Sequence, residues 1–266
     1  MNEAISREWD EASESWADFV RLGKDYYREE MNNPSTFKLI GNIQDQRILD
    51  LSCGEGYNTR ILARKGGIVI GIDLSEQLIK LARLRENEDR LGINYYVSDA
   101  ADLTEFENEY FDVVTCFMAL MDIEHYEDAI SEVARVLKKN GRFVFSIPHP
   151  CFEFGLSVNG EFFADWKYEE GAGNSAEKKA THLEIRRYFG IIKSQIRWDN
   201  ERLIKPFTTT SFHRTLTNYF HALYENKFLI VRLVEPKPTS KGVSMYPSLR
   251  KHTLIPHSII IEAITR

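Results

Sequence analysis

Glycines and carboxylates follow the apolar runs in the first half of the chain, and their types and spacing suit nucleotide binding. Residues 48–66, ILDLSCGEGYNTRILARKG, predict a strand ending at Asp50, a turn of small residues and a helix beginning near Tyr57. Gly54 and Gly56 would let the backbone approach a ligand where a side chain would collide. Ligands of open parallel sheets bind beyond the carboxyl ends of the strands. We therefore expect a ligand site at this turn.

Two further carboxylates end the next two apolar runs. Asp73, in GIDLS, lies about 20 residues after Gly54, where an acidic residue can accept hydrogen bonds from both hydroxyls of a ribose. Asp99, followed by Ala100 in VSDAADL, could accept a hydrogen bond from an adenine amino group. Simpler interpretations stay open: a plain tight turn for the glycines, a helix cap for Asp73 although Ser75 already suits that role, and an ordinary strand-end acid for Asp99.

The elements that would position these residues alternate between short apolar runs and helical patterns. This alternation predicts βαβ units and a parallel sheet. The expected strands are 47–51, 68–72, 93–97, 111–117 and 142–147, followed near the C-terminus by 228–234 and 258–263. One helix is expected from Glu127 to Lys139, with Asn140 and Gly141 as its left-handed stop. Another begins at Ser75 as its N-cap.

Four segments follow from this pattern: an N-terminal helical cap (1–40), a core (41–150), an insertion over the active site (151–210) and the remainder of the core (211–266). The insertion is rich in aromatic residues and contains an expected loop at 171–180. Residues 178–214 carry a surplus of positive charge. That surplus is either a solvated face or a docking region for an anionic substrate.

Composition narrows the class of protein. The chain has 266 residues, 43% hydrophobic and 28% charged, which fits one core domain with an accessory segment. A net charge of −6 argues against general affinity for nucleic acid. Cys53, Cys116 and Cys151 match no zinc or redox spacing, so we expect no metal site and free thiols in a reducing cytoplasm. The N-terminus lacks a signal-peptide layout, and the longest apolar stretch, 111–123, is too short to span a membrane.

The ordered set LDLSCGEG, GIDLS, VSDAADL, FDVVTCFMALMDI and EVARVLKKNGRFVFSI resembles class I S-adenosylmethionine-dependent methyltransferases, and most closely their type 11 branch, which modifies small molecules. The resemblance is close over residues 45–150 and looser over 211–234. It implies a doubly wound, Rossmann-like α/β fold with a mostly parallel seven-stranded sheet whose last strand is antiparallel. It also implies S-adenosylmethionine as the cofactor and S-adenosylhomocysteine as the product.

The resemblance further implies cofactor-contacting residues at the carboxyl ends of the first four strands. They are Asp50 near the methionine amino group, a backbone cradle at Ser52, Cys53, Gly54 and Gly56, Asp73 on the ribose, Leu74 against the adenine, Asp99 and Ala100 at the adenine edge, and Phe117 and Ala119 beside the transferred methyl group. Ser52 departs from the family, which usually has glycine there. Serine is small enough to keep the turn.

Two histidines are candidates for a general base. His149, in SIPHPCF, directly follows the fifth strand, and an imidazole can take up a proton near neutrality. His213 is the second candidate. A structural role for His149, bonded to the insertion, is the alternative.

The reaction expected is in-line transfer of a methyl group to a small molecule, anionic or aromatic in character. The Asn/Asp-Pro-Pro-aromatic motif of methyltransferases that act on nucleic-acid bases is absent after the fourth strand, where this chain has CFMA. Two rival functions stay open. One is a nucleotide-dependent oxidoreductase, although its third glycine would fall at Thr59. The other is a non-catalytic protein that binds S-adenosylmethionine or a partner.

Overall fold

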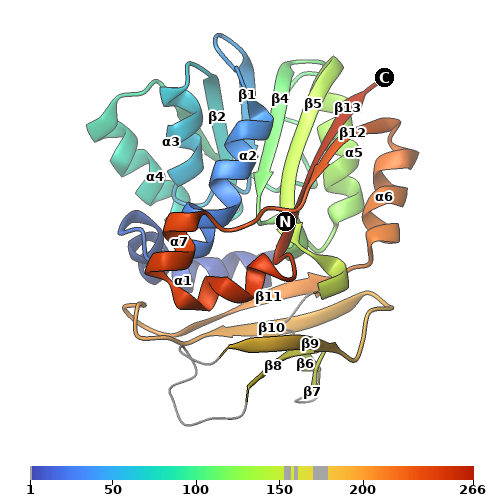
Figure 1. The fold of residues 1–266 in the computed structure, drawn as a ribbon. Coiled ribbons are helices and arrows are strands. Elements are labelled where there is room, and N and C mark those ends of the chain that lie inside the picture. Colours follow the sequence, from blue (N-terminus) through green and yellow to red (C-terminus); the bar gives the residue numbers. More distant parts are fainter. Residues whose placement is uncertain (1, 153–156, 159–160, 170–178) are drawn as a thin grey trace.

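The computed structural model describes residues 2–152, 157–158, 161–169 and 179–266. Seven strands form one sheet in the order β12-β13-β5-β4-β1-β2-β3 (Figure 1). Their bounds are β1 (Arg47–Leu51), β2 (Ile68–Asp73), β3 (Asn94–Val97), β4 (Phe111–Phe117), β5 (Leu137–Pro148), β12 (Phe228–Val234) and β13 (Ser258–Thr265). The first five strands pair in parallel, whereas β13 runs antiparallel to both β5 and β12. The expected doubly wound sheet with an antiparallel last strand is confirmed.

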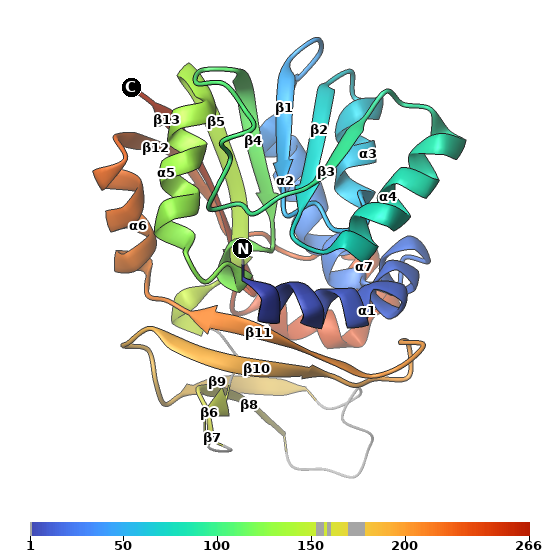
Figure 2. The same cartoon turned by 180° about the vertical axis from the view of Figure 1, so that it is seen from behind.

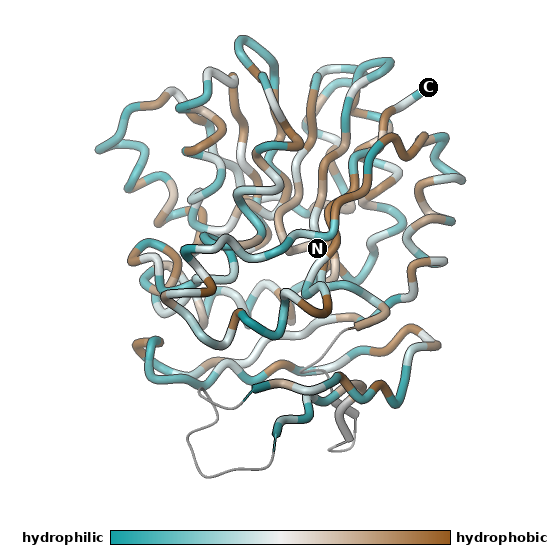
Figure 3. The backbone as a smooth tube through the Cα atoms, viewed as in Figure 1, coloured by the Kyte–Doolittle hydropathy of each residue, from teal (hydrophilic) through white to brown (hydrophobic). Residues whose placement is uncertain are grey.

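Helices cover both faces of the sheet because its strands alternate their apolar side chains between them. On β1, Ile48 packs with α2 (Asn33–Ile40) and α3 (Tyr57–Arg64). Leu49 and Leu51 point to the other face, towards α5 (Tyr126–Val136) and α6 (Leu216–Glu225), which Figure 2 shows in front. In Figure 3 the sheet strands carry much of the hydrophobic colour.

The helix starts expected near Tyr57 and at Ser75 agree with the structure. Ser75 caps α4 (Glu76–Asp89), and its Oγ accepts a hydrogen bond from the Leu78 N–H at 3.1 Å, as expected. The helix expected to run to Lys139 instead ends at Val136, and the next residue begins β5. Pairing of Leu137 with Phe111 on β4 overrides the helical pattern, and the left-handed Asn140 (φ 62°) lies within β5, where the pairing with β4 is irregular.

A second layer lies across the carboxyl edge of the sheet, below it in Figure 1. It consists of α1 (Glu3–Arg21) and an antiparallel hairpin of β10 (Ile192–Trp198) and β11 (Phe207–His213). Asp10 fastens α1 to the core, because its Oδ1 accepts from Ser75 Oγ at 2.6 Å and from the Gln77 N–H at 3.0 Å. The boundary expected at 210/211 falls inside β11.

The remaining elements are short. They are the π-helix η1 (Arg28–Asn32), the 3₁₀ helices η2 (Leu120–Asp122), η3 (Pro150–Phe152) and η4 (Pro247–Thr253), the α-helix α7 (Ser240–Met245), and the strands β6 (Ser157–Val158), β7 (Glu161–Phe162), β8 (Ala164–Tyr168) and β9 (Ala180–Ile185). The loop expected at 171–180 lies outside the described residues apart from its last two positions. None of the helices in the described part of the chain combines the length and apolar composition needed to cross a bilayer.

Candidate active site

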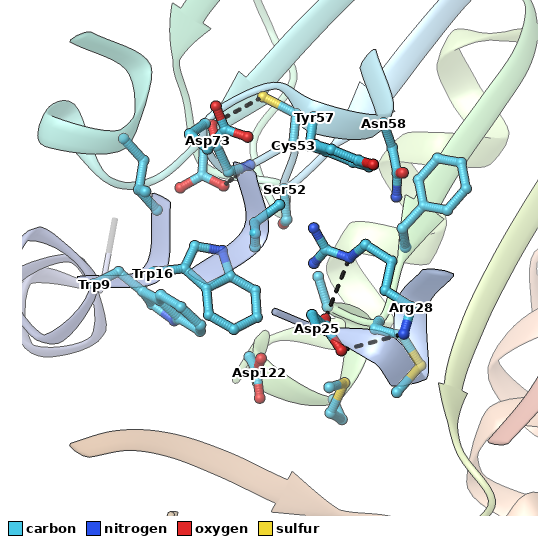
Figure 4. Close-up of a pocket in the computed structure, with 18 of the residues that line it drawn as sticks. Trp9, Trp16, Asp25, Arg28, Ser52, Cys53, Tyr57, Asn58, Asp73 and Asp122 are labelled. Atoms are coloured by element: carbon cyan, nitrogen blue, oxygen red, sulfur yellow. Dashed lines mark hydrogen bonds and ion pairs between the residues drawn. The ribbon is translucent and has the colours of Figure 1, made fainter. Parts of the chain in front are cut away.

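A cavity of about 470 Å³ lies between the carboxyl ends of the parallel strands and the layer of α1 and β10 (Figure 4). This size is within the range of roughly 300–1,000 Å³ that is usual for small-molecule sites. All the cofactor-contacting residues expected from the sequence line it except Gly56. They are Asp50, Ser52, Cys53, Gly54, Asp73, Leu74, Asp99, Ala100, Phe117 and Ala119.

The glycine turn after β1 and the carboxylate that ends β2 are in direct contact. The Gly54 N–H donates to Asp73 Oδ2 at 2.8 Å, and the Ser75 N–H donates to Asp73 Oδ1 at 2.9 Å. Each carboxylate oxygen keeps further acceptor capacity, so Asp73 can still receive hydrogen bonds from a ligand diol. Burial raises the pKa of Asp73 to about 6, against the lowering effect of the two N–H donors. The carboxylate is therefore mainly ionised at neutral pH.

Different structural constraints act on the two glycines of the turn. Gly54 (φ 61°) borders the cavity, and a Cβ there would lie 3.7 Å from Trp16 Nε1, an ordinary contact. Gly56 (φ 82°) is the left-handed N-cap of α3, and a Cβ there would lie only 2.4 Å from the Oη of Tyr95. Packing against Tyr95 thus requires Gly56. Ser52 is also left-handed (φ 53°), the conformation that glycine adopts at least cost.

Asp50, near the end of β1, lines the cavity. It is buried, and its two oxygens accept hydrogen bonds from the hydroxyls of Thr59 (2.6 Å) and Thr115 (2.8 Å). Burial raises its pKa to about 6, although both hydroxyls oppose the shift. Asp50 thereby joins β1 to α3 and β4, and it places a carboxylate in the cavity wall.

Asp99 reaches the cavity from the loop after β3. Its Oδ1 accepts from the Ala101 N–H at 3.0 Å, which holds the carboxylate in a local turn beside Ala100. Together with Leu74, which follows β2, these residues give one end of the cavity both an acidic and an apolar wall.

Arg28, in η1, is a further cavity residue that was not expected from the sequence. Its guanidinium points between Trp16 and Tyr57 in Figure 4, 5.4 Å and 5.7 Å from their ring centroids. Its Nε lies 3.4 Å from Asp25 Oδ2. A guanidinium so placed can bind a ligand carboxylate with its remaining donors. No spacing in the sequence distinguishes Arg28 from other arginines.

An aromatic wall combines the two segments that we expected to cover the site. Trp9 and Trp16 come from α1, and Trp198 comes from β10. Trp16 makes edge contacts with both, at centroid distances of 5.6 Å to Trp9 and 5.5 Å to Trp198. The Trp198 Nε1–H donates to Thr209 Oγ1 at 2.9 Å, which fixes the indole.

Most of the basic side chains described in residues 178–214 make contacts outside the cavity. Arg214 is buried and donates to the carbonyls of Leu120 and Ile123, at 3.2 Å and 2.6 Å. Among the described cations of this stretch, Arg202 alone lines the cavity, and its Nη1 donates to the Lys24 carbonyl at 2.7 Å. Lys178 lies outside the described residues.

The two histidines chosen from the sequence do not line the cavity. His149 is buried, its Nε2 lies 3.1 Å from Glu235 Oε1, and its Nδ1 accepts from the Cys151 N–H. Burial lowers its pKa. His213 Nε2 lies 2.6 Å from the Tyr188 carbonyl oxygen. The described histidines that do line the cavity are His125 and His257.

A signal for His257 is present in the sequence. Residues 255–257, Ile-Pro-His, repeat residues 147–149, and the two segments meet at the sheet edge. Ser258 pairs with Pro148, and the His149 N–H donates to the His257 carbonyl at 2.9 Å. The tertiary structure turns only the second histidine of this pair to the cavity.

Comparison with known proteins agrees with this geometry. Residues 49–145 match the model of a family described as a methyltransferase domain. Residues 49–145 thus match a methyltransferase domain. A ubiquinone biosynthesis O-methyltransferase of Hydrogenovibrio crunogenus is 32% identical to the chain over 149 residues, 55% of this chain. The match spans 57% of the length of that curated relative.

Solved structures extend the likeness beyond the methyltransferase domain. A protein of Listeria monocytogenes assigned to the S-adenosylmethionine-dependent methyltransferases is 26% identical, with a TM-score of 0.67 over 88% of this chain and 97% of that one. A Mesorhizobium loti methyltransferase of this type has a TM-score of 0.68 at 24% identity, over 87% and 96% of the two chains, and shows the same fold.

The residues present fit S-adenosylmethionine. Asp73 retains acceptor capacity for a ribose diol, Leu74 and Ala100 offer apolar contact for a purine, and Gly54 has no side chain to block the approach. Arg28 and Asp50 offer opposite charges for an amino-acid group. These groups therefore match the ribose, the adenine and the amino-acid end of the cofactor.

Proposed function

We propose that this protein transfers the methyl group of S-adenosylmethionine to a hydroxyl group of a small acceptor. The observation that carries the proposal is the 2.8 Å hydrogen bond from the Gly54 N–H to Asp73, because it joins the two expected nucleotide-binding motifs in the wall of one cavity. The hydroxyl acceptor is inferred from the O-methyltransferases that match the same part of the chain.

In this proposal the cofactor supplies a methyl group already activated on a sulfonium, so the protein mainly positions and shields the reactants. Asp73 would hold the ribose, Asp99 the adenine edge, and Arg28 the methionine carboxylate. The wall of Trp9, Trp16 and Trp198 would exclude water. We assign no catalytic role to His149 or His213, because neither lines the cavity.

We further propose an aromatic, uncharged acceptor. Of the two acceptor types expected from the sequence, an anionic one has fewer cationic partners in the cavity wall, since we assign Arg28 to the methionine carboxylate and Arg202 Nη1 donates to the Lys24 carbonyl. Asp122 and Glu124 add negative charge to the same wall. Tryptophan faces instead favour a flat ring. The free thiols of Cys53, Cys116 and Cys151 fit a reducing compartment, so we place the protein in the cytoplasm.

Calorimetry with S-adenosylhomocysteine tests the cofactor site. Asp73→Asn should weaken binding by about 10- to 150-fold, the loss of a charge-assisted hydrogen bond worth roughly 1.5–3 kcal/mol. Asp112→Asn is the matched control, since Asp112 accepts hydrogen bonds from Lys138 and the Arg47 N–H and does not line the cavity. Equal affinity of the Asp73 variant and native protein would remove the site assignment. Labelled donor incubated with a metabolite extract would then identify the acceptor.

A further inference from the structure

A cluster of rings borders the cavity beside the start of β13. It consists of Tyr27, His252 and His257. The His257 ring lies 4.9 Å from Tyr27 and 5.2 Å from His252, and Tyr27 lies 5.4 Å from His252. Tyr27 and His257 line the cavity, whereas His252 is buried behind them.

The backbone around His257 is held on both sides. The His149 N–H donates to the His257 carbonyl at 2.9 Å, and Ser258 pairs with Pro148 in the sheet. Ser258 Oγ also donates to Asn32 Oδ1 at 2.6 Å, and Asn32 itself lines the cavity. A side chain on such a support keeps a fixed position towards a bound molecule, which reactive groups require.

The surroundings of His257 keep its imidazole neutral. Burial and the nearby Lys251 ammonium lower its pKa to about 4. The two titratable rings in contact with His257 carry no charge that would favour its protonation. Burial lowers the pKa of His252 and raises the pKa of Tyr27, so both are uncharged at neutral pH. A neutral imidazole has one ring nitrogen with a lone pair that can accept a proton.

We propose that His257 is a catalytic residue that accepts the proton of the acceptor hydroxyl during methyl transfer. The inference rests on the proposed function. The oxygen–carbon bond forms as the carbon–sulfur bond breaks, with its electron pair going to sulfur, and the hydroxyl proton passes to the imidazole. The positive charge lost from sulfur is thus replaced by one on His257, so the cavity keeps its total charge. His125, the other described histidine of the cavity wall, is an exposed residue at the start of α5.

Two phenols of different acidity separate base catalysis from simple positioning. Para-cresol is almost fully protonated at neutral pH and needs a base, whereas a substantial share of para-nitrophenol is already phenolate there. His257→Gln should lower the rate with para-cresol by about 10²-fold, the low end of the usual contribution of a general base, because the lowered pKa makes His257 a weaker base than an ordinary imidazole. The rate with para-nitrophenol should change little. With para-cresol, the rate of His257→Gln should rise with pH as the phenolate forms, whereas the native rate should stay level around neutrality. His221→Gln is the matched control: His221 is exposed on α6 and does not line the cavity, so this variant should resemble the native protein with both phenols.

A binding measurement on the native protein supports the test without relying on turnover. The ring signals of His257 in nuclear magnetic resonance, assigned by their loss in His257→Gln, should shift when para-cresol is added to the protein saturated with S-adenosylhomocysteine. Absence of a shift, equal loss of rate with both phenols, or a similar loss in the His221 variant would overturn the role of His257. If the native protein binds S-adenosylhomocysteine but methylates neither phenol, the acceptor class and its base are wrong while the cofactor site stands. Failure to bind S-adenosylhomocysteine would contradict the proposed function itself.

Discussion

Gly56→Ala tests the reason for the second glycine of the turn after β1. The sequence assigns Gly56 to the ligand cradle, whereas in the structure its missing side chain makes room for Tyr95. An added Cβ would lie 2.4 Å from the Tyr95 Oη, 2.8 Å from Cζ and 3.0 Å from Cε1. All three distances are below ordinary van der Waals contact, so the ring or the helix start must move.

Three effects determine how Gly56→Ala changes the free energy of unfolding. A left-handed alanine costs about 1–2 kcal/mol, and overpacking costs about 1–3 kcal/mol. The lower entropy of the unfolded alanine chain returns about 0.4–1 kcal/mol. We therefore expect Gly56→Ala to reduce the free energy of unfolding by about 2–4 kcal/mol, measured by urea denaturation with an unchanged m value.

Gly92→Ala is the matched control. Gly92 has a similar left-handed backbone (φ 79°), but a Cβ there has no neighbour within 4 Å. Its substitution should cost only about 1 kcal/mol, the backbone part alone. Tyr95→Phe provides the second control, because the buried Oη has no hydrogen-bond partner among the described residues and can be removed at little cost. In that background Gly56→Ala should be less destabilising. Equal losses for the two glycine variants would refute the packing argument.

Two further predictions concern the cofactor site. The affinity for S-adenosylhomocysteine should fall as the pH drops through about 6, because Asp73 then takes up a proton and loses acceptor capacity; calorimetry across pH should show this fall in the native protein and a flatter profile in Asp73→Asn. Arg28→Gln should weaken binding of the same ligand by about 10- to 150-fold, because one charge-assisted contact is lost. Arg64→Gln is the control and should leave binding unchanged, since Arg64 is exposed, pairs with Asp89 and does not line the cavity. An affinity that does not change with pH would contradict the role of Asp73. Equal effects of the two arginine variants would contradict the role of Arg28.

The local pattern of the chain predicted much of the fold. The strands 47–51, 111–117 and 228–234 have the bounds expected from their apolar runs, and Ser75 caps α4 as its hydroxyl and position indicated. These features depend on side-chain period and on hydrogen bonds between near neighbours, which are present in the sequence itself. The predicted end of α5 was wrong because the helix end depends on the pairing of Leu137 with β4, a strand distant in sequence.

The amino-acid sequence by itself determined the α/β fold class, the turn at residues 52–56 and the order of the carboxylates that follow the strands. Parallel strands bring their carboxyl ends to one edge, so strand-end residues such as Asp50, Asp73 and Asp99 gather there whatever the rest of the chain does. Only the tertiary structure decided which residues from α1, η1, β10 and the start of β13 complete the cavity. His149 and His257 occupy equivalent Ile-Pro-His segments, but the pairing of β5 with β13 buries the first against Glu235 and turns the second to the cavity. That choice depends on packing between distant segments, which no local pattern records.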